Sequence, residues 1–171
     1  SEVIQREFRL TRDRKPIIVS MGDVAASGGY WIAAYGTKIF AEPNTITGSI
    51  GVFGLLPNIQ KFSTDQGITW DAVKTGPLAD SSSISRPKTP QELALLQRSI
   101  DWTYEQFLER VAEARRLPIG RVNEIAQGRV WSGTEALRLG LVDQLGGLED
   151  AVAAAATAAK LKDWTIEERV K

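Results

Sequence analysis

Ser27 is the residue whose neighbours best suit it to act as a nucleophile. It lies in the segment Gly22-Asp-Val-Ala-Ala-Ser-Gly-Gly29, where small residues surround the hydroxyl. Such neighbours would let an acyl group and the backbone approach the serine closely. A helix beginning at Gly28 would point its first amide groups at the space in front of the hydroxyl, where they could stabilise an oxyanion. The alternative interpretation is that Ser27 is an ordinary helix N-cap.

In the absence of histidine, a lysine is the best candidate for the base that would activate this serine. The sequence has no histidine and no cysteine, which excludes a Ser-His-Asp triad, a cysteine nucleophile, disulfides and the common zinc sites within the chain. A buried lysine can lose its proton, because desolvation disfavours the ammonium form. Lys74 and Lys88 flank a long loop and are the best internal candidates, although lysine is ordinarily a solvated surface residue. Asp23 reads as a local backbone acceptor rather than a catalytic group.

Size and charge limit the kinds of protein that this chain can be. Its 171 residues, 43% of them hydrophobic, are enough for one core, and we expect a single domain over residues 1–171. Basic and acidic residues both number 21 and are interleaved, which argues against a nucleic-acid partner. No apolar run approaches 18 residues, so we expect the chain as given to be soluble. The abrupt helical opening over residues 1–16 suggests a fragment, and nothing indicates a cofactor or metal.

The elements around Ser27 alternate between strand and helix. An apolar, β-branched run over residues 16–21 predicts a buried strand, residues 22–29 a tight turn and residues 30–35 a buried helix. Further short strands are predicted over residues 38–41 and 49–53. The alternation predicts an α/β protein.

The second half of the chain is mostly helical. Residues 57–67 read as a helix, 68–74 as extended and 76–88 as a loop. Thr89-Pro-Gln-Glu92 and Ser132-Gly-Thr-Glu135 are capping boxes, and each opens a helix, the first of which has apolar residues at three- and four-residue steps as far as Ala114. Other predicted elements are a short helix over 122–127, a helix over 148–161 and a terminal strand over 164–170.

The run KPIIVSMGDVAASGGYWIAA resembles the nucleophile segment of the signal peptide peptidase A family. TGSIGVFG, TGPLAD and IAQGRVWSGTEALRLGLVDQLGGLEDAV are similar to further motifs of that family, in the same order. The resemblance implies a Clp protease/crotonase-like fold of stacked ββα units. It implies a Ser/Lys peptidase that cleaves signal-peptide remnants and other membrane-derived apolar peptides. Ser27 matches the family nucleophile, and Gly28 matches a residue whose amide forms part of the oxyanion hole.

The sequence departs from the family pattern at the base. In short members of the family the lysine lies in the loop that matches residues 75–81, and Ala79 stands at its position here. In long members, which are tandem repeats, the N-terminal repeat provides the lysine and the C-terminal repeat keeps the serine. The chain resembles such a C-terminal repeat, without the first strand and the glycine-rich turn that precede the segment matching Ser1 to Ile4. We therefore expect no general-base lysine in this chain and little activity from it alone.

The resemblance implies further features of the site and of the whole protein. Four residues of the loop, Gly76, Pro77, Leu78 and Ala79, would line the substrate groove; a surface loop is the alternative. The whole protein is expected to be associated with a membrane and to form homo-oligomers, with an apolar peptide as substrate and the N-terminal repeat as a partner. Two other functions stay open: a crotonase-like acyl-CoA enzyme that uses amide donors without a serine nucleophile, and a non-catalytic assembly module of a membrane complex.

Overall fold

The computed structural model describes residues 1–168, which fall into two compact units. Unit 1 contains residues 1–51 and the chain from residue 105 onward, and unit 2 contains residues 52–104. Helix α4 (Pro90–Arg115) runs through the boundary between them. The prediction of a single domain over residues 1–171 stays a prediction.

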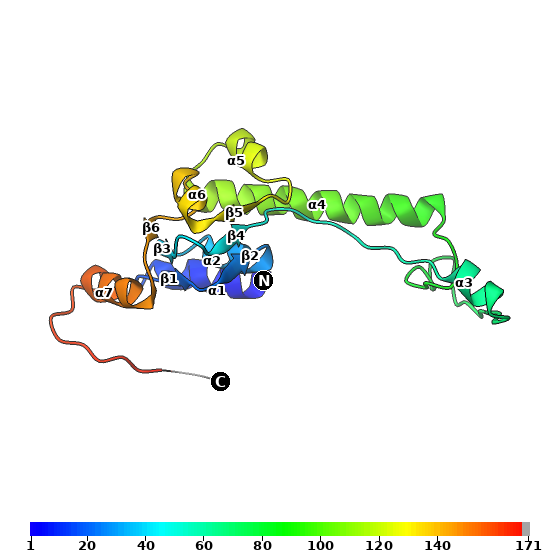
Figure 1. The fold of residues 1–171 in the computed structure, drawn as a ribbon, viewed down its shortest axis with the longest axis horizontal. Coiled ribbons are helices and arrows are strands. Elements are labelled where there is room, and N and C mark those ends of the chain that lie inside the picture. Colours follow the sequence, from blue (N-terminus) through cyan, green and yellow to red (C-terminus); the bar gives the residue numbers. More distant parts are fainter. Residues whose placement is uncertain (169–171) are drawn as a thin grey trace. The chain divides into compact units, whose positions relative to one another are not determined.

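Unit 1 is built on two small sheets, which confirms the predicted α/β class (Figure 1). The first sheet is parallel and has the order β1 (Ile18–Met21), β3 (Lys38–Ala41), β6 (Gln144–Leu145). The second has the order β2 (Val24–Ala26), β4 (Ile46–Gly48), β5 (Val130–Ser132), with β2 and β4 parallel and β5 antiparallel to β4.

The first four strands alternate between the two sheets. β1 joins the first sheet, β2 the second, β3 the first and β4 the second, and helix α2 (Gly28–Ala33) follows the first pair. The order β1, β2, α2 is one ββα unit of the expected kind. Because β2 ends directly before α2, Ser27 lies at the junction of strand and helix.

β3 is the central strand of the first sheet and is buried along most of its length. Its residues Ile39, Phe40 and Ala41 are at most 1% exposed, as expected for a parallel strand covered on both faces. Other helices of unit 1 are α1 (Glu2–Arg12), α5 (Ile119–Ile125), α6 (Gly133–Arg138) and α7 (Leu148–Ala158), of which α7 packs on β1 and β3. The largest fully buried apolar side chains of unit 1 are Tyr30, Tyr35, Ile39, Phe40, Ile50, Val111, Val122, Leu141 and Val142.

Helix α6 begins in close contact with the end of β3. An ideal Cβ atom built on Gly133, its first residue, would overlap the carbonyl oxygen of Glu42. The amide of Thr134 donates to the carbonyl of Pro43 at 3.3 Å, which holds the helix start in that place. Ser132 and Glu135 form the predicted capping box, with both reciprocal hydrogen bonds present. Only a glycine fits at position 133 without displacing one of the two backbones.

An ion pair between a largely buried arginine and an exposed aspartate joins the end of α4 to the two strands beside it. The guanidinium of Arg115, whose side chain is 8% exposed, donates to both carboxylate oxygens of Asp143 at 3.1 and 2.5 Å. Asp143 also accepts from the amide of Ile39 at 2.7 Å, and Arg115 donates to the carbonyl of Gly140 at 2.9 Å. The pair thus fixes the turn before β6 against β3.

Unit 2 contains α3 (Gln60–Asp65), the first part of α4 and irregular segments. The capping box of Thr89 and Glu92 is confirmed, with both amide-to-side-chain bonds present at 2.7 and 3.2 Å. Many large apolar side chains of this unit are exposed, among them Phe53, Leu55, Phe62, Trp70 and Val73. No helix among residues 1–168 combines the length and the apolar character that crossing a bilayer requires.

Several predicted boundaries are wrong. Residues 49–53 form no strand, because Gly48 and Ser49 have φ angles of 75° and 49° and turn the chain out of the sheet. The helix over 57–67 shortens to α3, and that over 148–161 ends at Ala158. Residues 164–168 form no strand, while 169–170 lie outside the described residues.

Candidate functional site

Ser27 has a backbone conformation that is rare for any residue other than glycine. Its φ and ψ angles are 52° and −118°, and its side chain is exposed. It occupies the N-cap position of α2, as the alternative interpretation expects, but its side chain makes no capping hydrogen bond. The hydroxyl is therefore presented on a strained strand-to-helix turn and is not used to finish the helix, an arrangement typical of nucleophilic serines.

Backbone hydrogen bonds hold Ser27 in this conformation. Its amide donates to the carbonyl of Gly48 at 2.9 Å, continuing the parallel pairing of β2 with β4, and its carbonyl accepts from the amide of Trp31 at 2.9 Å. The hydroxyl of Thr47 donates to the carbonyl of Ala25 at 2.8 Å, which adds a second tie between these strands. The turn is thus fixed from both sides, and such over-determination is what allows a strained residue to persist.

A second turn with positive φ lies beside the first. Ala26 is paired with Gly48, and the next residue, Ser49, also has positive φ and donates its amide to the carbonyl of Arg129 at 2.8 Å. Ser49 is half-buried. Sequence reasoning quoted the TGSIG segment but assigned no role to this serine. Ser49 could have been found from the parallel register of β2 and β4. This register places Gly48 opposite Ala26, so that Ser49 follows one strand as Ser27 follows the other.

The strain at Ser27 predicts an unusual response to mutation. Ser27→Gly is expected to raise the free energy of unfolding by about 1 kcal/mol, because glycine adopts this conformation without a steric penalty. Ser27→Ala should leave it nearly unchanged, since no capping bond is lost. Urea denaturation of the three proteins measures both effects. An ordinary N-cap serine would give the reverse, with alanine costing about 1 kcal/mol and glycine a few tenths.

Helix α2 offers its first amides beside the hydroxyl. It begins at Gly28, directly after Ser27, and the first amides of a helix have no partner within it. Gly28 also lies against the start of α1, because a Cβ atom there would be 2.9 Å from the hydroxyl oxygen of Ser1. The indole of Trp31 donates to the carboxylate of Glu2 at 3.1 Å and fixes this approach. Ser27 and Gly28 thus lie at the turn from β2 into α2, and their roles as nucleophile and oxyanion donor stay predictions.

An apolar hollow of about 410 Å³ adjoins the turn. Ala25 and Gly29, each two residues from Ser27, form part of its wall. The other walls come from α1, β1, β2, α2 and the residue before β1, and include Phe8, Ile17, Ile18, Val24 and Ile32. A hollow of this kind suits an apolar side chain better than a charged one.

The remaining predicted site residues belong to unit 2. Gly76, Pro77, Leu78 and Ala79 form a turn in which the amide of Ala79 donates to the carbonyl of Gly76 at 3.2 Å. The ammonium of Lys74 is paired with Asp80 at 2.8 Å. The ammonium of Lys88 donates to the carbonyls of Ser81 and Ser83 at 2.6 and 2.5 Å. Both lysines are therefore engaged with their own loop.

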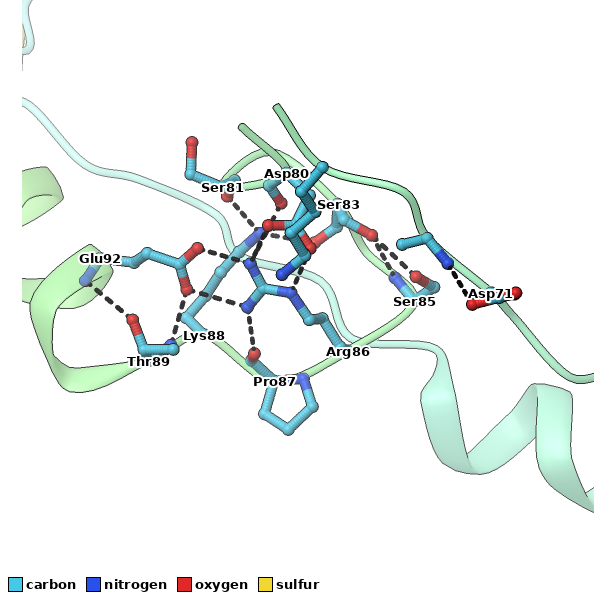
Figure 2. Close-up of polar contacts among 12 residues, drawn as sticks. Asp71, Asp80, Ser81, Ser83, Ser85, Arg86, Pro87, Lys88, Thr89 and Glu92 are labelled. Carbon is cyan, nitrogen blue, oxygen red and sulfur yellow. Dashed lines mark hydrogen bonds and ion pairs between the residues drawn. The ribbon is translucent and has the colours of Figure 1, made fainter. Parts of the chain in front are cut away.

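Figure 2 shows the centre of that loop, where the guanidinium of Arg86 lies between the carboxylates of Asp80 and Glu92. Hydrogen bonds from Arg86 and from Lys74 hold the pKa of Asp80 well below its usual range. Hydrogen bonds from Arg86 and from the backbone of Thr89 lower the pKa of Glu92 to about 2. Both carboxylates therefore stay charged throughout the neutral range. Sequence reasoning placed Glu92 in a capping box but did not find its partner, which is six residues away and outside the helix.

Comparison with known proteins finds a peptidase family. Residues 9–162 match the family described as Peptidase family S49. Protease 4 of Salmonella typhi is 45% identical over 98% of this chain, and the serine protease SPPA, chloroplastic, of Arabidopsis thaliana is 39% identical over 91% of it. The chain spans only 27% and 23% of the length of these relatives.

One solved structure resembles the chain more distantly. It is a putative enoyl-CoA hydratase/isomerase family protein from Hyphomonas neptunium, 19% identical, with a TM-score of 0.45 over 93% of this chain and 41% of that one. A similarity this low has no bearing on activity.

Proposed function

The chain belongs to peptidase family S49, and from that premise we propose that it carries the nucleophile of a serine protease, Ser27. The observation that supports this most directly is the conformation of Ser27 itself. Ser27 is exposed on a strained turn, directly before the first residue of α2, and its side chain makes no capping hydrogen bond. A serine that served only the fold would gain stability by capping the helix, so the strain is best explained by a requirement for catalysis.

In the proposed reaction the Ser27 oxygen attacks the carbonyl carbon of a peptide bond as a neutral amine takes the hydroxyl proton. The carbonyl oxygen becomes an oxyanion, which the Gly28 amide stabilises. The C–N bond then breaks, and the leaving nitrogen receives the proton from the ammonium. Water, deprotonated by the same amine, then attacks the acyl-enzyme ester. The tetrahedral intermediate formed in this step releases the carboxylic acid product and regenerates the serine hydroxyl.

We propose that the amine is a lysine from outside these 171 residues. Three observations support this. Ala79 stands where the resemblance calls for a lysine, Lys74 is paired with Asp80, and Lys88 is bound by two carbonyls. The relatives are about four times as long as the chain, so they have room for a second repeat that supplies the lysine. On this proposal the N-terminal repeat is a partner in catalysis, and a homo-oligomer would bring such parts together.

The proposed substrates are apolar peptides, such as the remnants of signal peptides. The hollow beside Ser27 supports this class, because its walls are mostly aliphatic and aromatic. An apolar side chain next to the scissile bond would gain about 1.5–3 kcal/mol from burial there. Charged side chains at the same position would lose their hydration without a partner.

The proposed division of the active site predicts a large difference between two proteins. The 171-residue chain is expected to hydrolyse a fluorogenic apolar peptide at less than about 1% of the rate of the full-length protein, because loss of a general base costs about 10²–10⁴-fold. Robust hydrolysis by the chain alone would contradict the external lysine.

A fluorophosphonate probe separates the other functions in the full-length protein. An activated serine reacts with the probe, whereas a crotonase-like enzyme that relies on amide donors, or an assembly module, does not. Labelling that is lost in Ser27→Gly as well as in Ser27→Ala supports the peptidase. Binding of peptide without labelling and without turnover supports the assembly module.

A further inference from the structure

The guanidinium of Arg86 lies at the centre of the hydrogen bonds in the loop that precedes α4. Its Nε atom donates to Asp80 at 2.6 Å, and one terminal nitrogen donates to the other oxygen of Asp80 at 2.7 Å. The two terminal nitrogens donate to the two oxygens of Glu92 at 2.9 and 2.6 Å, and one also reaches the carbonyl of Pro87 at 2.9 Å. One guanidinium thus binds two carboxylates, each through two hydrogen bonds (Figure 2).

The two carboxylates belong to structurally different places. Glu92 is in the first turn of α4, has a side chain that is 1% exposed, and is fixed further by its capping box with Thr89. Asp80 lies in the irregular loop, directly after Gly76, Pro77, Leu78 and Ala79. Arg86 therefore ties a segment without regular structure to the start of a 26-residue helix.

Little else holds that segment in one conformation. Among the described contacts of residues 76–83, the backbone bonds are those of tight turns, from Ala79 to Gly76, Ser81 to Leu78 and Ser83 to Asp80. Leu78 is the only large apolar side chain in this stretch, and it is only half-buried. The hydrogen bond of an isolated turn offsets little of the conformational entropy that the backbone loses on ordering. Polar side-chain contacts must therefore provide most of the free energy that keeps this segment ordered. Lys74 and Lys88 each bond to one side of the loop, and among the described side chains Arg86 is the one that bonds to both the loop and the helix.

We propose that Arg86 is a positioning residue for peptide binding: it holds residues 76–80 in the conformation that the substrate meets. This rests on the proposed function, and on the expectation that this loop lines the groove. Binding a peptide against a loop that first has to be ordered costs affinity, whereas a loop held in advance does not incur that cost. Arg86 then affects the Michaelis constant more than the chemical step, because its described hydrogen bonds go to Asp80, Pro87 and Glu92 and not to a group proposed to react.

The test uses the full-length protein with Arg86→Ala. KM for an apolar peptide is expected to rise about tenfold while kcat changes less than about threefold. The reason is that the substitution weakens binding of the substrate in the ground state and leaves the reacting groups unchanged. Labelling of Ser27 by a small fluorophosphonate, which does not need the groove, should be unchanged. Amide hydrogen exchange over residues 76–83 should become faster. Millimolar guanidinium should restore KM in part, and Arg86→Lys should not, because an ammonium cannot form two bidentate pairs.

Arg98→Ala is the matched control. Arg98 is an exposed arginine on α4 in the same unit, and its substitution should leave KM, labelling and exchange unchanged. Should Arg86→Ala fold poorly, Asp80→Asn removes the charge on the loop side and keeps Glu92 and the helix cap, and it should raise KM in the same way. An unchanged KM in a folded variant with normal Ser27 labelling overturns the positioning role and leaves the peptidase proposal standing. Activity that survives Ser27→Ala overturns the peptidase proposal itself.

Discussion

Full-length protein with Ser27→Ala is expected to hydrolyse apolar peptides at least about a thousandfold more slowly than the unmodified protein. The reason is that the acyl intermediate cannot form without the oxygen nucleophile, so that only the amide donors and bound substrate can still act on the peptide bond. KM should change little, because the methyl group of alanine occupies the same turn. Initial rates with a fluorogenic peptide, together with unfolding curves of both proteins, measure the effect.

Ser99→Ala serves as the control for this change. Ser99 lies on the exposed surface of α4, and removing its hydroxyl should leave both the rate and the fold unaltered. A Ser27→Ala protein that keeps even a tenth of the activity would show that another group is the nucleophile. Loss of activity accompanied by a large loss of stability would point instead to a structural role for the hydroxyl, which the missing capping bond does not support.

Gly133→Ala is expected to destabilise the protein by about 3 kcal/mol, at the upper end of what overpacking costs. The added methyl group would overlap the carbonyl oxygen of Glu42, which belongs to the backbone and cannot rotate away as a side chain could. Either α6 must move or the end of β3 must shift, and β3 is the central strand of the first sheet. Denaturant unfolding of the protein gives the free energy directly.

Gly120→Ala provides the comparison for that measurement. Gly120 lies inside α5, and an added Cβ atom would meet no other atom within 4 Å. Alanine there should raise the free energy of unfolding by about 0.5–1 kcal/mol, because glycine is the poorer helix former. Equal effects at the two positions would mean that the contact between α6 and Glu42 has no influence on stability.

The sequence predicted the elements whose signals are local. The apolar run of β1 and β3 and the two capping boxes depend on residues within a few positions of one another, and all four were found. β2, β4, β5 and β6 were missed because strands of two or three residues exist only through their partners. The strand over 49–53 was wrong for a related reason, since its apolar residues follow a turn whose positive φ angles leave little trace in the sequence.

The candidate site divides in the same way. The small residues around Ser27 predicted an accessible turn before a helix, and the structure has one. They could not predict the φ angle of Ser27, because it depends on the bond from its amide to Gly48 in another strand. Arg86 was missed because its two carboxylates lie on opposite sides of it in the sequence, one in a loop and one in a helix.

The positive φ of Ser27 also bears on how related sequences can be read. Glycine adopts the backbone conformation of this turn with less steric strain than serine. In a relative that is no longer selected for peptidase activity, a substitution to glycine would therefore increase stability. A relative with glycine at the matching position would therefore have a higher free energy of unfolding than an active enzyme and could not form an acyl intermediate. On the proposal that Ser27 is the nucleophile, serine at this position serves the reaction at the expense of stability.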